Sequence, residues 1–224
     1  MKKRLPYIVF LILIPAVILC GALLFDAKRS AWISLCVVIL SCVPFFLRYE
    51  KKKPDTKELV LIAALTALSV AGRMLFAFLP GFKPVTALVV LTALYFGKEA
   101  GFMTGALSAV VSNFYFGQGP WTPFQMLSWG LIGFIAGLLA APLKKSKVLL
   151  CVYGALSGVM FSMLMDVWTV IWADGYFNIS RYAAAIVTAL PVTAVYAASN
   201  VVFLLLLSKP LGKILDRLKT KYGI

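Results

Sequence analysis

Arg73 is a charged side chain inside a long apolar run, where a charge is costly unless it has a partner or a function. It follows the stretch ELVLIAALTALSVAG, in which Glu58 is the only other charge. A charged group at mid-depth in a bilayer costs about 2.5 kcal/mol or more, so such residues usually face a cavity. Because Arg73 lies about six residues, or roughly 9 Å, from the end of its run, its side chain can also reach the membrane surface. The sequence leaves both interpretations open.

Asp166 is the second ionisable group in an apolar run, within FSMLMDVWTV. It lies about six residues from the end of that run, at the same predicted depth as Arg73. The two groups can form an ion pair that only stabilises the protein, or they can line one polar pocket. In the second case Arg73 and Asp166 would fix a polar or charged part of a bound molecule.

Two connecting segments near these charges combine aromatic and polar side chains. The first, NFYFGQGPWTPFQM, contains Asn113, Trp121 and Gln125, and the second, TVIWADGYFNISRY, contains Trp172. Aromatic residues often mark the membrane interface, which would explain the tryptophans alone. It would not explain the two amides, which offer paired donors and acceptors. We therefore predict an outward-facing pocket for a small organic solute, in which the tryptophans stack on a ring system.

Several kinds of chemistry have no residues to support them. The sequence contains no histidine, which removes the usual metal ligand and general base and argues against zinc-dependent membrane proteases. It also lacks a P-loop motif for ATP. Cys20, Cys36, Cys42 and Cys151 lie in apolar runs without CxxC spacing, which is typical of ordinary membrane-helix residues. We expect no metal, no cofactor and no enzymatic activity.

These residues lie in a chain that consists mostly of long apolar runs. Of its 224 residues 62% are hydrophobic, and the mean hydropathy is +0.96. Backbone polar groups in a bilayer need hydrogen bonds within the protein, and most of these runs are too long for barrel strands. The sequence therefore predicts an all-α fold, an integral membrane bundle of eight transmembrane helices. The predicted spans are 5–25, 31–47, 58–79, 84–97, 100–116, 121–143, 148–173 and 182–208.

The net charge of +14 is arranged in short basic patches between the apolar runs. In a soluble protein such a charge would favour nucleic-acid binding, but this arrangement is typical of cytoplasmic loops. With the N-terminus inside, the outer loops contain few basic residues, namely Lys28, Arg29, Lys83 and Arg181. We predict a multi-pass protein of a bacterial plasma membrane, with both termini in the cytoplasm and no nucleic-acid partner.

The charged stretch RYEKKKPDTKE divides the chain into two membrane parts. We predict a transmembrane hairpin at 1–50, a cytoplasmic linker at 51–57, a six-helix substrate-binding core at 58–208 and a basic tail at 209–224. The tail has the pattern of a short amphipathic helix on the cytoplasmic surface. The hairpin carries no obvious chemistry, so the function is assigned to the core.

Small residues recur every four positions along three of the predicted helices. The three faces are Ala63, Ala67 and Ala71; Gly101, Gly105 and Ala109; and Gly133 and Gly137. Such faces let helices approach closely, and most of them only pack a bundle. Because the Ala63 face begins at the cytoplasmic side, docking of a membrane partner is the alternative there.

Four stretches of the predicted core carry a family resemblance. They are ALTALSVAGR at 64–73, FGKEAGFMTGALSAVVSNFYFGQGPWTPFQM at 96–126, WGLIGFIAGLL at 129–139 and NVVFLLLLSKPLGKILDRLKTKYG at 200–223. On these stretches residues 57–224 resemble the substrate-binding S components of energy-coupling factor (ECF) transporters. GPWTPFQM is the most specific of them, and it is most similar to the cobalamin-type S components.

The resemblance implies a fold, a function and partners. S components have six helices, bind a vitamin or similar micronutrient near the outer face, and dock on a transmembrane T component driven by two cytoplasmic ATPases. Ala63, Ala67 and Ala71 match the alanine-rich face that contacts the T component. ATP would then be bound by the partners, which agrees with the missing P-loop. The hairpin at 1–50 departs from the six-helix pattern.

Two other classes of function remain open from the sequence. A self-sufficient secondary transporter of a small organic solute would need a coupling carboxylate, and Asp166 is the best candidate. A membrane enzyme would need a catalytic pairing that the sequence lacks. The predicted solute-binding residues are Arg73, Asn113, Trp121, Gln125, Asp166 and Trp172.

Overall fold

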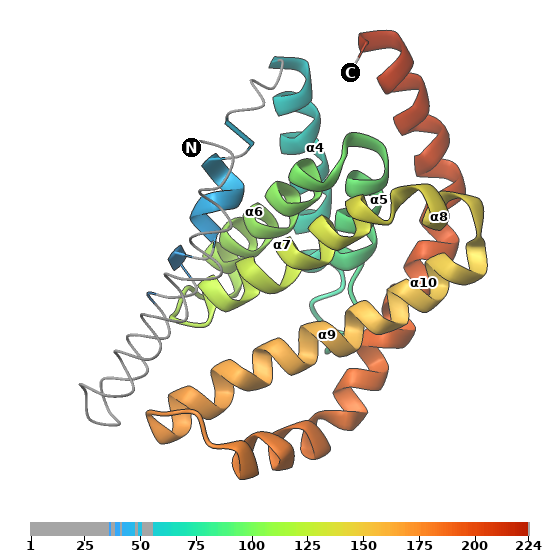
Figure 1. Cartoon of the computed structure of the whole chain (residues 1–224). Coiled ribbons are helices and arrows are strands. Elements are labelled where there is room, and N and C mark those ends of the chain that lie inside the picture. Colours follow the sequence, from blue (N-terminus) through green and yellow to red (C-terminus); the bar gives the residue numbers. More distant parts are fainter. Residues whose placement is uncertain (1–35, 37–38, 41, 48, 51–55, 224) are drawn as a thin grey trace.

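The structure is a computed structural model that describes residues 56–223 together with 36, 39–40, 42–47 and 49–50 (Figure 1). The described chain from residue 56 forms α4 (Thr56–Leu75), α5 (Val85–Phe96), α6 (Lys98–Phe116), α7 (Thr122–Leu138), α8 (Ala140–Lys145), α9 (Lys147–Asp174) and α10 (Ile179–Tyr222). Since these described residues form helices and no strand, the all-α prediction is confirmed. Most of the predicted hairpin at 1–50, including Cys20, lies outside the described residues.

The described helices establish a multi-pass membrane protein. Three of them, α4, α9 and α10, are long and apolar enough to cross a membrane, and α5 and α7 are shorter apolar helices. The structure therefore supports a membrane bundle without establishing the predicted number of eight spans.

Two predicted helix boundaries differ from the structure. The run 121–143 is divided at Leu139 into α7 and α8. Pro142 explains this break, because a proline has no N–H for the carbonyl of residue 138 and its ring would collide with that carbonyl. The tail at 209–224 is not a separate surface helix, because α10 continues through it to Tyr222. Leu211, Leu215 and Leu218 follow helical spacing there and pack against the core.

Helix α5 lies at the centre of the described bundle. Every residue of VTALVVLTALYF except Tyr95 is buried, as expected for a helix that is apolar on all sides. It contacts α4, α6, α7, α9 and α10. Figure 1 shows α9 and α10 as a long hairpin that diverges from the other helices toward its connecting turn. Gly175 ends α9 with a φ of 78°, and Asn178 caps α10 by accepting from the backbone of Ser180 and Arg181.

Glycines let α6 and α7 approach to backbone contact. A methyl group on Gly105 would meet the carbonyl of Trp129, and one on Gly133 would meet the carbonyl of Gly101. A methyl group on Gly137 would meet the backbone of Lys98. The packing interpretation of these two small-residue faces is therefore confirmed.

The pairing of α9 with α10 is also close. A methyl group on Gly158 would lie 2.6 Å from the backbone nitrogen of Ala197. Asn200 Nδ2 donates to the carbonyl of Gly154 at 3.1 Å, and Tyr153 Oη ties α9 to α7 by donating to the carbonyl of Ile132 at 2.5 Å. These contacts fix α7, α9 and α10 relative to one another.

Part of the predicted second hairpin helix packs on the core. The ring of Phe45 stacks on that of Phe102 in α6, with centroids 4.0 Å apart, and meets Phe134 of α7 edge-on at 4.9 Å. Cys42 and Phe45 are buried in this contact. The α6–α7 pair therefore carries an additional helical segment on this side.

We expect Gly105→Leu to destabilise the protein, because a leucine at backbone contact forces α6 and α7 apart. Overpacking of this kind costs about 1–3 kcal/mol, which corresponds to a fall of roughly 3–10 °C in the midpoint of thermal unfolding. The midpoint can be measured on protein purified in a mild detergent. Ala183→Leu is the matched control, because Ala183 is exposed on α10. Equal midpoints for the two variants would contradict the packing described here.

Candidate functional site

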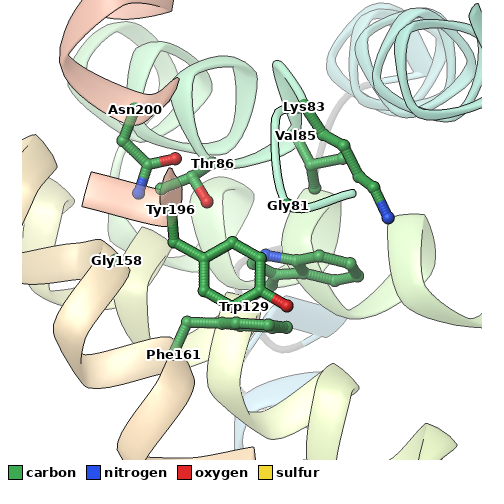
Figure 2. A pocket seen from close by; sticks show the side chains of 9 residues that line it. All are labelled: Gly81, Lys83, Val85, Thr86, Trp129, Gly158, Phe161, Tyr196 and Asn200. Atoms are coloured by element: carbon green, nitrogen blue, oxygen red, sulfur yellow. The ribbon is translucent and has the colours of Figure 1, made fainter. Parts of the chain in front are cut away.

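A small cavity lies where the 76–84 loop meets α5, α7, α9 and α10. It is lined by Gly81, Lys83, Val85, Thr86, Trp129, Gly158, Phe161, Tyr196 and Asn200 (Figure 2). Each packed element contributes at least one side chain, so the cavity exists only when the bundle is assembled.

Three aromatic rings form one side of the cavity. Trp129 of α7 and Phe161 of α9 are stacked, with centroids 4.9 Å apart and planes at 19°. Tyr196 of α10 meets Phe161 edge-on at 5.3 Å. Figure 2 shows Tyr196 directed toward the stacked pair, with Thr86 and Asn200 beside it. Aromatic faces with a few polar groups suit an organic molecule that contains a ring system.

The 76–84 loop closes the cavity against α10. The backbone N–H of Lys83 donates to Ser199 Oγ at 2.8 Å, and that hydroxyl donates back to the carbonyl of Lys83 at 3.1 Å. Gly81 has a φ of 79°, and a methyl group there would press on Val195 and Tyr196. The free space in the cavity, about 20 Å³, has room for about one water molecule. A larger solute can bind only if the loop or a helix moves.

Beside the cavity, a hydrogen-bond network joins α4, α6 and α7. Arg73 Nη1 donates to Ser112 Oγ and to Asn113 Oδ1, the latter at 2.9 Å. Asn113 Nδ2 donates in turn to Thr122 Oγ1 and Gln125 Oε1, both at 2.8 Å. The structure therefore brings together three of the residues singled out in the sequence, namely Arg73, Asn113 and Gln125.

Arg73 is enclosed by aromatic rings next to the cavity. Its guanidinium carbon lies 4.5 Å from the ring centre of Phe116 and 5.1 Å from that of Trp129, which also lines the cavity. Only 6% of Arg73 is exposed, so its side chain does not extend to the membrane surface. Its Nε is buried without a hydrogen-bond partner.

Arg73 and Asp166 do not form an ion pair. Among the described residues no carboxylate lies within 4.0 Å of Arg73, and the ion pair near this end of α9 joins Asp174 to Arg181 at 2.7 Å. Asp166 itself has no ion-pair partner among the described residues.

None of the six predicted solute-binding residues lines the cavity. Trp172 is 52% exposed and its ring packs on that of Trp168 at 4.8 Å. Trp121 is also exposed, beside Gly119, and Asp166 is partly buried on α9.

Several lining residues were not singled out in the sequence. Trp129 stands within the stretch WGLIGFIAGLL, but Phe161 and Tyr196 are aromatic residues in apolar runs and carry no distinctive signal. Asn200 does carry one, since it is an amide inside the apolar run 182–208. Among the described residues, no three potential metal-ligating side chains are grouped together.

The alanine face of α4 points away from the bundle. Ala63, Ala67 and Ala71 are exposed, whereas Ile62, Leu65 and Ser69 on the same helix are buried. Unlike the glycine faces of α6 and α7, this stripe of small residues packs on no described helix.

Comparison with known proteins gives one family match. The model of the ECF-type riboflavin transporter S component family matches residues 53–217. No curated protein and no solved structure matches. The family is one of transporter components, not of enzymes, and implies a small-molecule substrate with T and ATPase partners. The likeness to cobalamin-type S components is not confirmed by this match. Because the match spans most of the chain, including every element that lines the cavity, the protein belongs to the ECF-type riboflavin transporter S component family.

Proposed function

We propose that this chain captures a vitamin at the outer face of the membrane, in the cavity beside Trp129, for ATP-driven uptake by partner subunits. The observation that carries the proposal is the stacked pair of Trp129 and Phe161, which Tyr196 and the 76–84 loop enclose. In a transporter component, a cavity with aromatic walls that its own loop closes is best explained as a solute site.

The solute we propose is riboflavin or a related flavin. The description of the matching family names riboflavin. The flat three-ring system of riboflavin suits stacking against aromatic side chains such as Trp129 and Phe161. Cobalamin is the alternative solute, because the stretch GPWTPFQM is similar to the cobalamin-type S components. Binding of cobalamin would require a much larger opening of the cavity.

The six residues singled out in the sequence have two proposed roles. Arg73, Asn113 and Gln125 hold α4, α6 and α7 together around one wall of the site through their hydrogen bonds. Trp121 and Trp172 are exposed and Asp166 is partly buried, and we assign these three residues to the entry region, where an incoming solute would first meet the protein. Both proposed roles are compatible with a site at the end of the bundle that the predicted topology puts outside.

Docking of the T component is assigned to the exposed stripe of Ala63, Ala67 and Ala71. An unpartnered face of small residues on a membrane helix allows close approach of another helix. The partner subunits would supply ATP hydrolysis. A self-sufficient secondary transporter with Asp166 as coupling carboxylate is the competing function, and it would need no such face.

We expect Phe161→Leu to weaken riboflavin binding by about fivefold or more, because the substitution removes the ring that stacks on Trp129. Binding can be followed through quenching of flavin fluorescence on the purified chain. Phe114→Leu is the matched control, because Phe114 is 78% exposed on α6. Unchanged affinity in Phe161→Leu, or the same loss in both variants, would argue against the cavity as the site.

Ser199→Ala should release the bound flavin about fivefold faster, because it removes both hydrogen bonds that hold the 76–84 loop on α10. The dissociation rate can be measured by stopped-flow displacement. Thr188→Ala, which removes a hydroxyl that bonds only within α10, should leave the rate unchanged. A dissociation rate in Ser199→Ala equal to that of the wild type would show that the loop does not close the site.

Ala67→Leu should abolish uptake of labelled riboflavin by cells that produce the T component and ATPases with this chain, while binding to the purified chain is retained. The reason is that a larger side chain blocks close approach of a partner helix. Ala183→Leu serves as the control. Uptake that persists without the partner subunits and follows a proton gradient would instead support the secondary transporter.

A further inference from the structure

Arg73 is a buried cation without an acidic partner among the described residues. Its guanidinium is held by neutral groups, the hydroxyl of Ser112 and the amide of Asn113, and its Nε has no partner. Burying an unpaired charge is costly, and neutral hydrogen bonds offset only part of that cost. The resting site therefore carries a positive charge that an anion could neutralise.

Lys83 adds a second positive charge at the same place. Its ammonium lies 5.5 Å from the ring centre of Phe116, the ring that Arg73 contacts at 4.5 Å. The pKa of Lys83, which lies in the 76–84 loop, is lowered by burial and then by the nearby charge of Arg73. Lys83 also lines the cavity, so the pair links the cavity to the ring of Phe116.

No described acidic residue at this end of the bundle pairs with Arg73 or Lys83. Asp174 pairs with Arg181, and Asp166, which is partly buried on α9, has no ion-pair partner among the described residues. Two cations that contact the same ring raise each other's electrostatic energy, and a bound anion would lower it. Nothing in the described part of the chain supplies that anion.

We propose that the transported solute carries an anionic group, a phosphate or a carboxylate, which binds between Arg73 and Lys83 while its ring system lies against Trp129 and Phe161. This inference rests on the proposed function and narrows its substrate class, from a neutral vitamin such as riboflavin to a charged form such as riboflavin 5′-phosphate. Trp129 contacts both Arg73 and Phe161, and Lys83 lines the cavity, so an anionic group on a solute at the stacked rings would lie beside both cations once the cavity opens.

The test compares probes that differ only in one anionic group. Dissociation constants are measured for riboflavin and riboflavin 5′-phosphate, and for pyridoxal and pyridoxal 5′-phosphate, on the full chain in nanodiscs of phosphatidylcholine. We expect at least one phosphorylated probe to bind about tenfold or more tightly than its neutral twin, as charge-assisted hydrogen bonds would give. In Arg73→Gln and in Lys83→Gln, the ratio of the dissociation constants of the neutral and the phosphorylated probe should fall to about one. Arg181→Gln, which changes an exposed arginine that is paired with Asp174, should leave this ratio unchanged.

The other outcomes overturn the proposal. Equal or tighter binding of the neutral probes would contradict an anionic solute but would not affect the proposed transport function. A failure of every phosphorylated probe to bind would also contradict an anionic solute. If phosphatidylglycerol in the nanodiscs abolishes the preference, the cations bind a lipid headgroup instead. If Arg73→Gln does not fold, Lys83→Gln still decides the question, because Lys83 is in a loop and only partly buried.

Discussion

Helices α6 and α7 approach so closely at Gly105 that a methyl group would collide with the carbonyl of Trp129. The rest of the site depends on this contact. It places Asn113 of α6 beside Gln125 of α7, and these two amides in turn engage Arg73 from α4. It also fixes Trp129 on the α7 side of the cavity, opposite α10. In a membrane, where helices gain little from apolar burial, backbone contact between glycines is a main source of such precision.

The second constraint is the charge of Arg73. The bundle encloses it with two aromatic rings and two neutral acceptors instead of a carboxylate. An ion pair with Asp166 would have neutralised this charge. Without one, the guanidinium keeps the positive charge that the proposed anion site requires. The 76–84 loop adds Lys83 to the same place, and Ser199 holds that loop over the cavity.

Some of this could be predicted from the sequence, and the reason differs from residue to residue. Arg73 and Asn113 were recognisable because a charge or an amide in an apolar region is unusual in itself. The glycine faces were recognisable from their spacing. Phe161 and Tyr196 were not, because an aromatic residue in an apolar run is ordinary until the helices around it are placed. The supposed pairing of Arg73 with Asp166 rested on equal depth alone, and depth does not determine which way each helix faces. The break at Leu139 could have been found from Pro142, whereas the unbroken course of α10 depends on leucines that pack on α5 and its neighbours.

The proposed function requires that the cavity beside Trp129 binds a vitamin that contains a ring system. This can be tested by mass spectrometry of the small molecules released from the gently purified chain, after its membranes have been incubated with a mixture of vitamins. We expect one vitamin with an aromatic ring system to co-elute with the protein in roughly equal molar amount. Release of no ring-containing vitamin would contradict the proposed binding.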